Sequence, residues 1–76
     1  MKNYSELRFL YDSLSPGVVD MQIILMCKNN KLDSVDLKTI LQQYKSAKFT
    51  GDNRSLKVLE NVLNNIDKDI LLELED

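Results

Sequence analysis

The stretch from Val18 to Cys27 most constrains the fold, because only Asp20 and Gln22 among its ten residues are polar. Ten residues are too few to cross a bilayer, which takes about twenty. This apolar surface must therefore be covered by the rest of the chain or by a partner chain. A single domain of 76 residues buries only roughly 60% of the surface that its unfolded form exposes. We therefore expect one marginally stable domain over residues 1–76 that gains from a partner.

We expect this stretch to be a helix over about 16–28. Ser15 suits a helix cap and Pro16 suits a first helical position, so we expect this helix to follow the preceding one directly, with no loop between them. Asn29 and Asn30 then favour a stop. A strand over 22–27 is the alternative, because a short apolar run has no periodicity that assigns it. A helix that is apolar nearly all round lies at the centre of a bundle or in an oligomer interface.

Three further helices are predicted by capping signals and apolar spacing. The first covers about 4–14 and opens with the capping-box spacing of Asn3 and Glu6. The next follows a cap at Asp33 or Ser34 and ends near residue 48. Its apolar stripe contains Leu37, Ile40, Leu41, Tyr44 and Ala47. Thr50-Gly51-Asp52-Asn53 is the strongest turn signal in the chain.

The last predicted helix runs over about 54–74 and carries an apolar seam with steps of three and four residues. The seam consists of Leu56, Leu59, Leu63, Ile66 and Ile70. Such spacing is typical of a helix that packs in a bundle. The fold class predicted for the chain is therefore all-α, a small up-down bundle of about four helices that is either closed in one chain or completed by dimerisation.

Charge is distributed unevenly along the chain, although its formal net value is only −2. Residues 31–57 contain six basic and three acidic side chains, whereas residues 58–76 contain one basic and six acidic side chains. The candidate basic patch consists of Lys38, Lys45, Lys48, Arg54 and Lys57. These side chains either bind phosphates, form a solvated face or contact the acidic tail.

The residue types present exclude several kinds of chemistry. The chain has no histidine, which removes the commonest general base and the commonest metal ligand. Its one cysteine, Cys27, cannot form an internal disulfide or a Cys/His zinc site, and we expect it to be a small buried side chain. There is no glycine-rich phosphate loop. We therefore expect no enzymatic activity, no metal and no cofactor.

Asp33-Ser34-Val35 resembles the Asp-Ser-Leu attachment site of acyl carrier proteins, which are small helical bundles that carry phosphopantetheine on that serine. The resemblance implies a modified serine at the start of a helix. Here Asn-Asn-Lys-Leu precedes the motif where that family has a glycine-containing turn, and lysines follow where that family presents an acidic face. A helix cap is therefore the interpretation that we adopt for this tripeptide.

We expect a cytoplasmic, non-enzymatic module that binds another protein or itself by burying amphipathic helix faces. It would act as a regulator, an inhibitor or immunity-type adaptor, or a chaperone, and a homodimer is the expected assembly; no membrane segment is expected. The candidate core or interface residues are Val19, Ile23, Met26, Leu63, Ile66 and Ile70. The alternative function is a nucleic-acid-binding regulator that uses the basic patch, although the acidic composition disfavours it.

Overall fold

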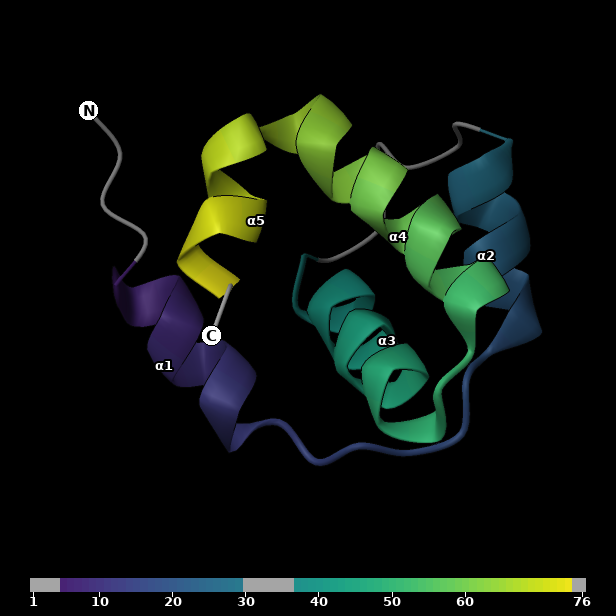
Figure 1. The fold of residues 1–76 in the computed structure, drawn as a ribbon, viewed down its shortest axis with the longest axis horizontal. Helices are drawn as coiled ribbons and strands as arrows, with labels where there is room; N and C mark the ends of the chain where they lie inside the picture. The colour runs from purple at the N-terminus through teal and green to yellow at the C-terminus, as the bar shows by residue number, and fades with distance from the viewer. Residues whose placement is uncertain (1–4, 30–36, 75–76) are drawn as a thin grey trace.

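A computed structural model describes residues 5–29 and 37–74 and contains five α-helices in these ranges (Figure 1). The helices are α1 Ser5–Ser13, α2 Met21–Lys28, α3 Leu37–Thr50, α4 Asn53–Ile66 and α5 Lys68–Leu74. No strand occurs in these two ranges, so the predicted all-α class is confirmed. The expected caps at Asn3, Asp33 and Ser34 lie outside the described residues.

Helices α3 and α4 form the centre of the molecule, and the other three surround them. Helix α1 packs against α3 and α5, whereas α2 packs against α4. In Figure 1, α2 therefore lies at one edge of the molecule, while α1 and α5 lie at the opposite edge. The most apolar segment of the sequence thus occupies a peripheral position rather than a central one.

The core is built by the apolar stripes of the predicted helices. All five helices contribute to one cluster of buried side chains. Its most deeply buried large members, each at most 1% exposed, are Ile40, Leu41, Leu59, Leu63, Ile70 and Leu74. The stripe predicted for α3 faces this cluster, since Tyr44 and Ala47 are also buried and Leu37 packs against it.

The predicted turn between α3 and α4 is confirmed. Gly51 has a φ of +75°, a left-handed conformation that glycine adopts without steric cost. The Asp52 N–H donates to the Ala47 carbonyl at 2.9 Å, which satisfies a carbonyl at the end of α3. The Asp52 side chain caps α4 by accepting hydrogen bonds from the Ser55 N–H (3.2 Å) and the Ser55 hydroxyl (2.7 Å).

The prediction that the second helix follows the first directly, with no loop between them, is wrong. Helix α2 begins at Met21, not at Pro16, and its cap is Asp20, whose Oδ1 accepts a hydrogen bond from the Gln22 N–H at 2.9 Å. Residues 15–20, here called the strap, have no regular structure and run past α3 to reach α2 (Figure 1). The strap stays non-helical because side chains of α3 accept hydrogen bonds from its backbone, as described below.

The predicted single helix over 54–74 is also wrong, because it is divided at Asp67. This residue has extended backbone, with φ −168° and ψ 127°, and it caps both neighbouring helices. Its N–H donates to the Leu63 carbonyl at 2.9 Å, which closes α4. Its Oδ1 accepts a hydrogen bond from the Asp69 N–H at 3.0 Å, which satisfies a donor in the first turn of α5.

Candidate functional site

Helix α2 buries one face and leaves the other exposed. Ile24 and Cys27 point into the core with 6% and 2% exposure, whereas Met21 and Leu25 are 61% and 52% exposed. Met21 and Leu25 are separated by four residues, so they lie on the same side of the helix. Three residues before Met21, Val18 in the strap is 91% exposed. An apolar row thus runs from the strap along the outer side of α2.

Phe49 in the last turn of α3 extends this row, because its ring is 75% exposed beside the strap. We define the apolar patch as the four exposed side chains Val18, Met21, Leu25 and Phe49. A hollow of about 560 Å³, the strap groove, lies between the strap and the end of α3. It is lined by Pro16, Gly17, Val18, Val19, Met21, Phe49, Thr50 and Asp52. The apolar patch therefore combines a protruding aromatic ring with an adjacent depression.

A second hollow lies on the other side of Phe49. It measures about 330 Å³ and is lined by Tyr11, Asp12, Pro16, Lys45, Lys48 and Phe49. Because Phe49 and Pro16 line both hollows, they form a ridge between them. The basic side chain of Lys48 thus lies on one side of this ridge, and the acidic side chain of Asp52 lies on the other.

Two buried polar side chains of α3 hold the strap in place. The Gly17 N–H donates to the Ser46 hydroxyl oxygen at 2.9 Å, and the Asp20 N–H donates to Oε1 of Gln43. Gln43 and Ser46 are 9% and 1% exposed, so both acceptors lie on the buried side of α3, whereas the strap residues that donate to them are exposed. Between the two anchors, Val19 packs against the core while Val18 faces outward. The strap therefore presents Val18 in a fixed position.

Charged side chains lie on both sides of the ridge. Two hydrogen bonds from Ser55, the stronger from its hydroxyl, hold the pKa of the Asp52 carboxyl below its ordinary value. Asp52 is therefore ionised at neutral pH. Lys48 is exposed, with its Nζ 5.5 Å from the centre of the Tyr44 ring. The ridge is thus flanked by charges of opposite sign.

The six candidate core or interface residues fall into three groups. Leu63 and Ile70 are buried in the core at 0% and 1% exposure. Val19 and Ile23 are partly buried against that core, and Met26 is partly buried on α2. Ile66 is 48% exposed at the end of α4, because the break at Asp67 follows it. The exposed side of α2 carries Met21 and Leu25 instead of the positions that the sequence singled out.

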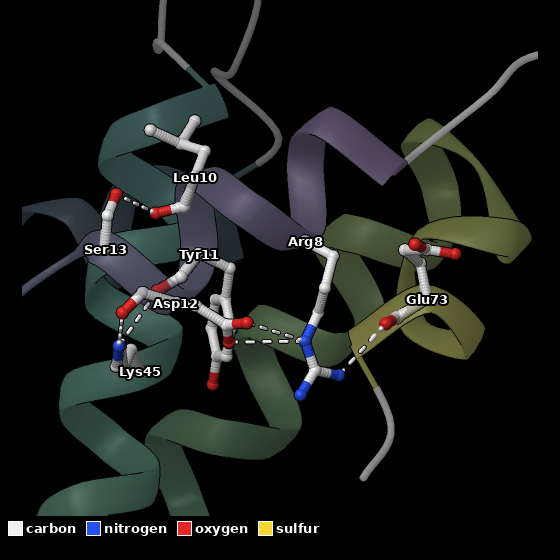
Figure 2. Close-up of polar contacts among 7 residues, drawn as sticks. All are labelled: Arg8, Leu10, Tyr11, Asp12, Ser13, Lys45 and Glu73. Atoms are coloured by element: carbon white, nitrogen blue, oxygen red, sulfur yellow. Dashed lines mark hydrogen bonds and ion pairs between the residues drawn. The ribbon is translucent and has the colours of Figure 1, made fainter.

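One member of the candidate basic patch, Lys45, makes an intramolecular contact. Its Nζ donates to the carbonyl oxygens of Tyr11 (2.9 Å) and Asp12 (3.0 Å) at the end of α1 (Figure 2). The same Nζ lies 5.3 Å from the centre of the Tyr11 ring. A cation in this position stabilises the negative end of the helix dipole. Lys45 therefore joins α3 to α1.

The other four basic candidates are exposed and are distributed over two helices. Lys38 and Lys48 lie near opposite ends of α3, and Arg54 and Lys57 lie in the first half of α4. Figure 2 shows a further basic contact, in which Arg8 of α1 pairs with Asp12 and donates to the Glu73 carbonyl at 3.2 Å. Two of the cations at the α1 end of the molecule thus serve the fold itself.

A more polar hollow of about 330 Å³ lies between α2 and α4. It is lined by Cys27, Lys28, Val58, Asn61, Val62, Asn64 and Asn65. Burial raises the pKa of the Cys27 thiol, so the thiolate that a nucleophile needs is disfavoured. Within the two described ranges, no three side chains among His, Cys, Asp and Glu are placed to hold a metal ion. The thiol that lines this hollow therefore favours its protonated form.

Comparison with protein-family models, with curated proteins and with solved structures gives no match for this chain. Among the helices that the structure describes, none combines the length and the apolar content needed to cross a membrane. The site must therefore be judged from its own geometry. The sequence did not lead us to predict the role of Phe49, an exposed aromatic residue outside the buried stripe of α3.

Proposed function

We propose that this protein is a non-enzymatic protein–protein interaction module whose binding surface is the apolar patch. The observation that carries the proposal is the 75% exposure of Phe49 beside the strap groove and the 91% exposed Val18. At roughly 150–200 Å² for each fully exposed side chain, the four members of the patch present on the order of 500 Å² of accessible surface. An apolar patch of this size is comparable with the largest one on a typical monomer, and such patches are often functional.

The fixed backbone of the strap supports this proposal. Ordering a flexible loop on binding costs conformational entropy, and a segment that is already ordered avoids this cost. Gln43 and Ser46 order the strap in the free chain through their hydrogen bonds to Asp20 and Gly17. A partner that covers Val18 thus meets a preformed surface.

We further propose the cytoplasm as the location and a regulator, an adaptor or a chaperone as the role. A single buried cysteine is common in reducing compartments, and a chain without histidine lacks the usual acid–base group. The protein partner is another chain, a second copy of this chain, or both. A second copy that covers α2 would complete the helical bundle that one chain leaves open at its edge.

Nucleic-acid binding remains the rival function, and its test must avoid Lys45. Reversing the charge of Lys45 would break the contact with α1, so loss of binding would then reflect unfolding. Replacement of Lys48, Arg54 and Lys57 by glutamate leaves that contact in place. If a folded triple variant loses salt-dependent affinity for a duplex or single-stranded oligonucleotide, the rival function gains support.

Photo-crosslinking in cells that produce the protein tests the proposed function. Benzoylphenylalanine replaces Phe49 in one variant and Phe9 in the control. Phe9 suits this purpose because its ring is 79% exposed on α1 and lines neither hollow beside the ridge. We expect protein adducts from position 49 and fewer from position 9, with the adducts identified by mass spectrometry.

The adducts should also disappear when Val18→Asp is introduced beside the probe, because a charge would then lie in the apolar patch. A folded probe variant that gives no protein adduct at position 49, or equal adducts at positions 49 and 9, would refute the proposed function.

A further inference from the structure

We infer that the strap groove is occupied by a second copy of this chain, in a two-fold dimer in which Phe49 of each copy enters the strap groove of the other. This inference rests on the proposed function and names its partner. A two-fold interface uses the same patch on both copies, so the patch must be complementary to itself. The arrangement of Phe49 and the strap groove meets this requirement.

The first argument is shape. Phe49 projects from the end of α3 with 75% of its surface exposed, and the strap groove lies directly beside it. Rotation by 180° about an axis between them places each ring over the groove of the other copy. The groove holds about 560 Å³, whereas a cavity of roughly 150 Å³ already accepts benzene in another protein. The groove is open to solvent, and its volume exceeds that of a phenyl ring.

The second argument is chemistry. The walls of the groove include the apolar side chains of Val18, Val19 and Met21. Methionine is flexible and polarisable, and its sulfur makes favourable contacts with aromatic rings. The ring of Phe49, exposed in the free chain, would exchange water for these contacts in the dimer. An aromatic anchor seated in an apolar pocket is the usual centre of a protein interface.

The third argument is charge. Lys48 lies on one side of the Phe49 ridge and Asp52 on the other. A two-fold axis parallel to the ridge exchanges the two sides, so Lys48 of one copy approaches Asp52 of the other. Asp12, which also lines the Lys48 side, is already paired with Arg8. Because Asp52 keeps a lowered pKa, it carries its charge at neutral pH.

The fourth argument is area. The apolar patch supplies on the order of 500 Å² on each copy, or about 1,000 Å² in the dimer, before the surrounding rim is counted. This total lies at the lower end of specific interfaces, where complexes are weak and form reversibly. We therefore expect a monomer–dimer equilibrium that depends on concentration.

Sedimentation velocity of the purified chain over a concentration series tests the inference. The mass should rise from that of the 8.8 kDa chain to twice that value. Phe49→Ala should weaken dimerisation by about 100-fold or more, because the dimer loses two anchors at once. Phe9→Ala is the matched control and should leave the dissociation constant unchanged. A wild-type chain that stays monomeric at millimolar concentration, or equal effects of the two variants, would overturn the inference.

A groove-filling variant tests the geometry independently. Gly17 lines the groove, and a Cβ placed on it meets nothing within 4 Å, so a Gly17→Trp side chain can begin there without a clash and adds bulk beside the groove. Gly17→Trp and Phe49→Ala should each be monomeric alone. When they are mixed, one intact ring and one open groove remain, so native mass spectrometry should detect the heterodimer. A mixture with no heterodimer, at a concentration where the wild type is fully dimeric, would refute the exchange of rings.

Failure of this inference is distinguishable from failure of the proposed function. If crosslinks from position 49 join this chain only to other proteins, the second copy is wrong and the interaction module stands. If the adducts are joined copies of this chain and the purified chain dimerises through Phe49, both are supported. If position 49 gives no protein adduct and the purified chain is monomeric, both are wrong.

Discussion

Replacement of Lys45 by methionine removes the ammonium group and keeps an unbranched apolar side chain about as long as the aliphatic part of lysine. In the wild type, Nζ donates to the carbonyls of Tyr11 (2.9 Å) and Asp12 (3.0 Å). A hydrogen bond to a charged group contributes about 1.5–3 kcal/mol, and a cation at a helix C-terminus about 0.3–1 kcal/mol. Lys45 is partly exposed, so water replaces part of this interaction. We therefore expect the free energy of unfolding to fall by about 1–2 kcal/mol.

Urea unfolding followed by far-ultraviolet circular dichroism measures this loss. The midpoint should move to lower urea with an unchanged slope, because the area exposed on unfolding stays the same. For a domain of this size, the melting temperature should fall by about 5–12 °C.

Lys48→Met is the matched control for this experiment. Its ammonium is exposed and lies 5.5 Å from the centre of the Tyr44 ring, so its loss should cost less than about 0.5 kcal/mol. Equal effects of the two substitutions would show that Lys45 does not anchor α1. A Lys45→Met variant as stable as the wild type would show the same.

Three further predictions concern the strap, the core and the cap of α4. Ser46→Ala removes the acceptor of the Gly17 N–H, which is exposed and can bind water instead, so stability should fall by about 0.5–1.5 kcal/mol and hydrogen exchange at Gly17 should accelerate. Leu63→Ala should cost about 2–5 kcal/mol because Leu63 is 0% exposed, whereas Ile66→Ala should cost less than about 1 kcal/mol in the same urea assay. The lowered pKa of Asp52 means that the folded state favours its ionised form, so its contribution is complete above about pH 4 and is lost as the pH falls through the folded pKa. The difference in unfolding free energy between the wild type and Asp52→Ala should therefore shrink on acidification below about pH 4, and a constant difference would contradict the assignment.

Residue types near a helix end predict that end when its capping groups come from neighbouring residues in the sequence. The turn at 50–53 has a glycine in the left-handed conformation followed by an aspartate cap, and both are read directly from residue type. The apolar stripe of α3 likewise faces the core as its spacing predicts. Such features need no knowledge of distant residues.

The strap was not predictable from its own residues, because its conformation depends on α3. Ser15 and Pro16 satisfy every local preference for a helix start. The acceptors that draw the strap backbone away from a helix, Gln43 and Ser46, lie more than twenty residues later in the sequence. A tertiary hydrogen bond thus outweighs a local preference.

The break at Asp67 had a local signal that the apolar seam obscured. Asn64, Asn65 and Asp67 are residue types that favour caps over helix interiors. Two helices joined at a corner can each present leucine or isoleucine to one core, so a continuous seam does not require a continuous helix. Ile66, next to the break, is consequently exposed although it fits the seam.

The apolar patch was not predicted for a related reason. The apolar character of residues 18–27 predicts that part of this segment packs against other residues. It does not predict which face of the helix is buried in the core. Val19, Ile23 and Met26 lie toward the protein, whereas Met21 and Leu25 face outward. The available signal was Phe49, which lies off the buried stripe of its helix and so indicates an unpaired apolar face.

The strap holds part of the apolar patch in an exposed position. A chain optimised only for stability would cover Val18 and Phe49, since burial of such a side chain contributes about 1.5–3 kcal/mol. Here two polar side chains are instead buried to hold the strap in a position that exposes Val18. Departures from local preference that lower stability are expected at functional sites. In the proposed dimer, the apolar patches of the two copies would cover each other and bury these side chains. The free energy of unfolding should therefore rise with the concentration of the protein.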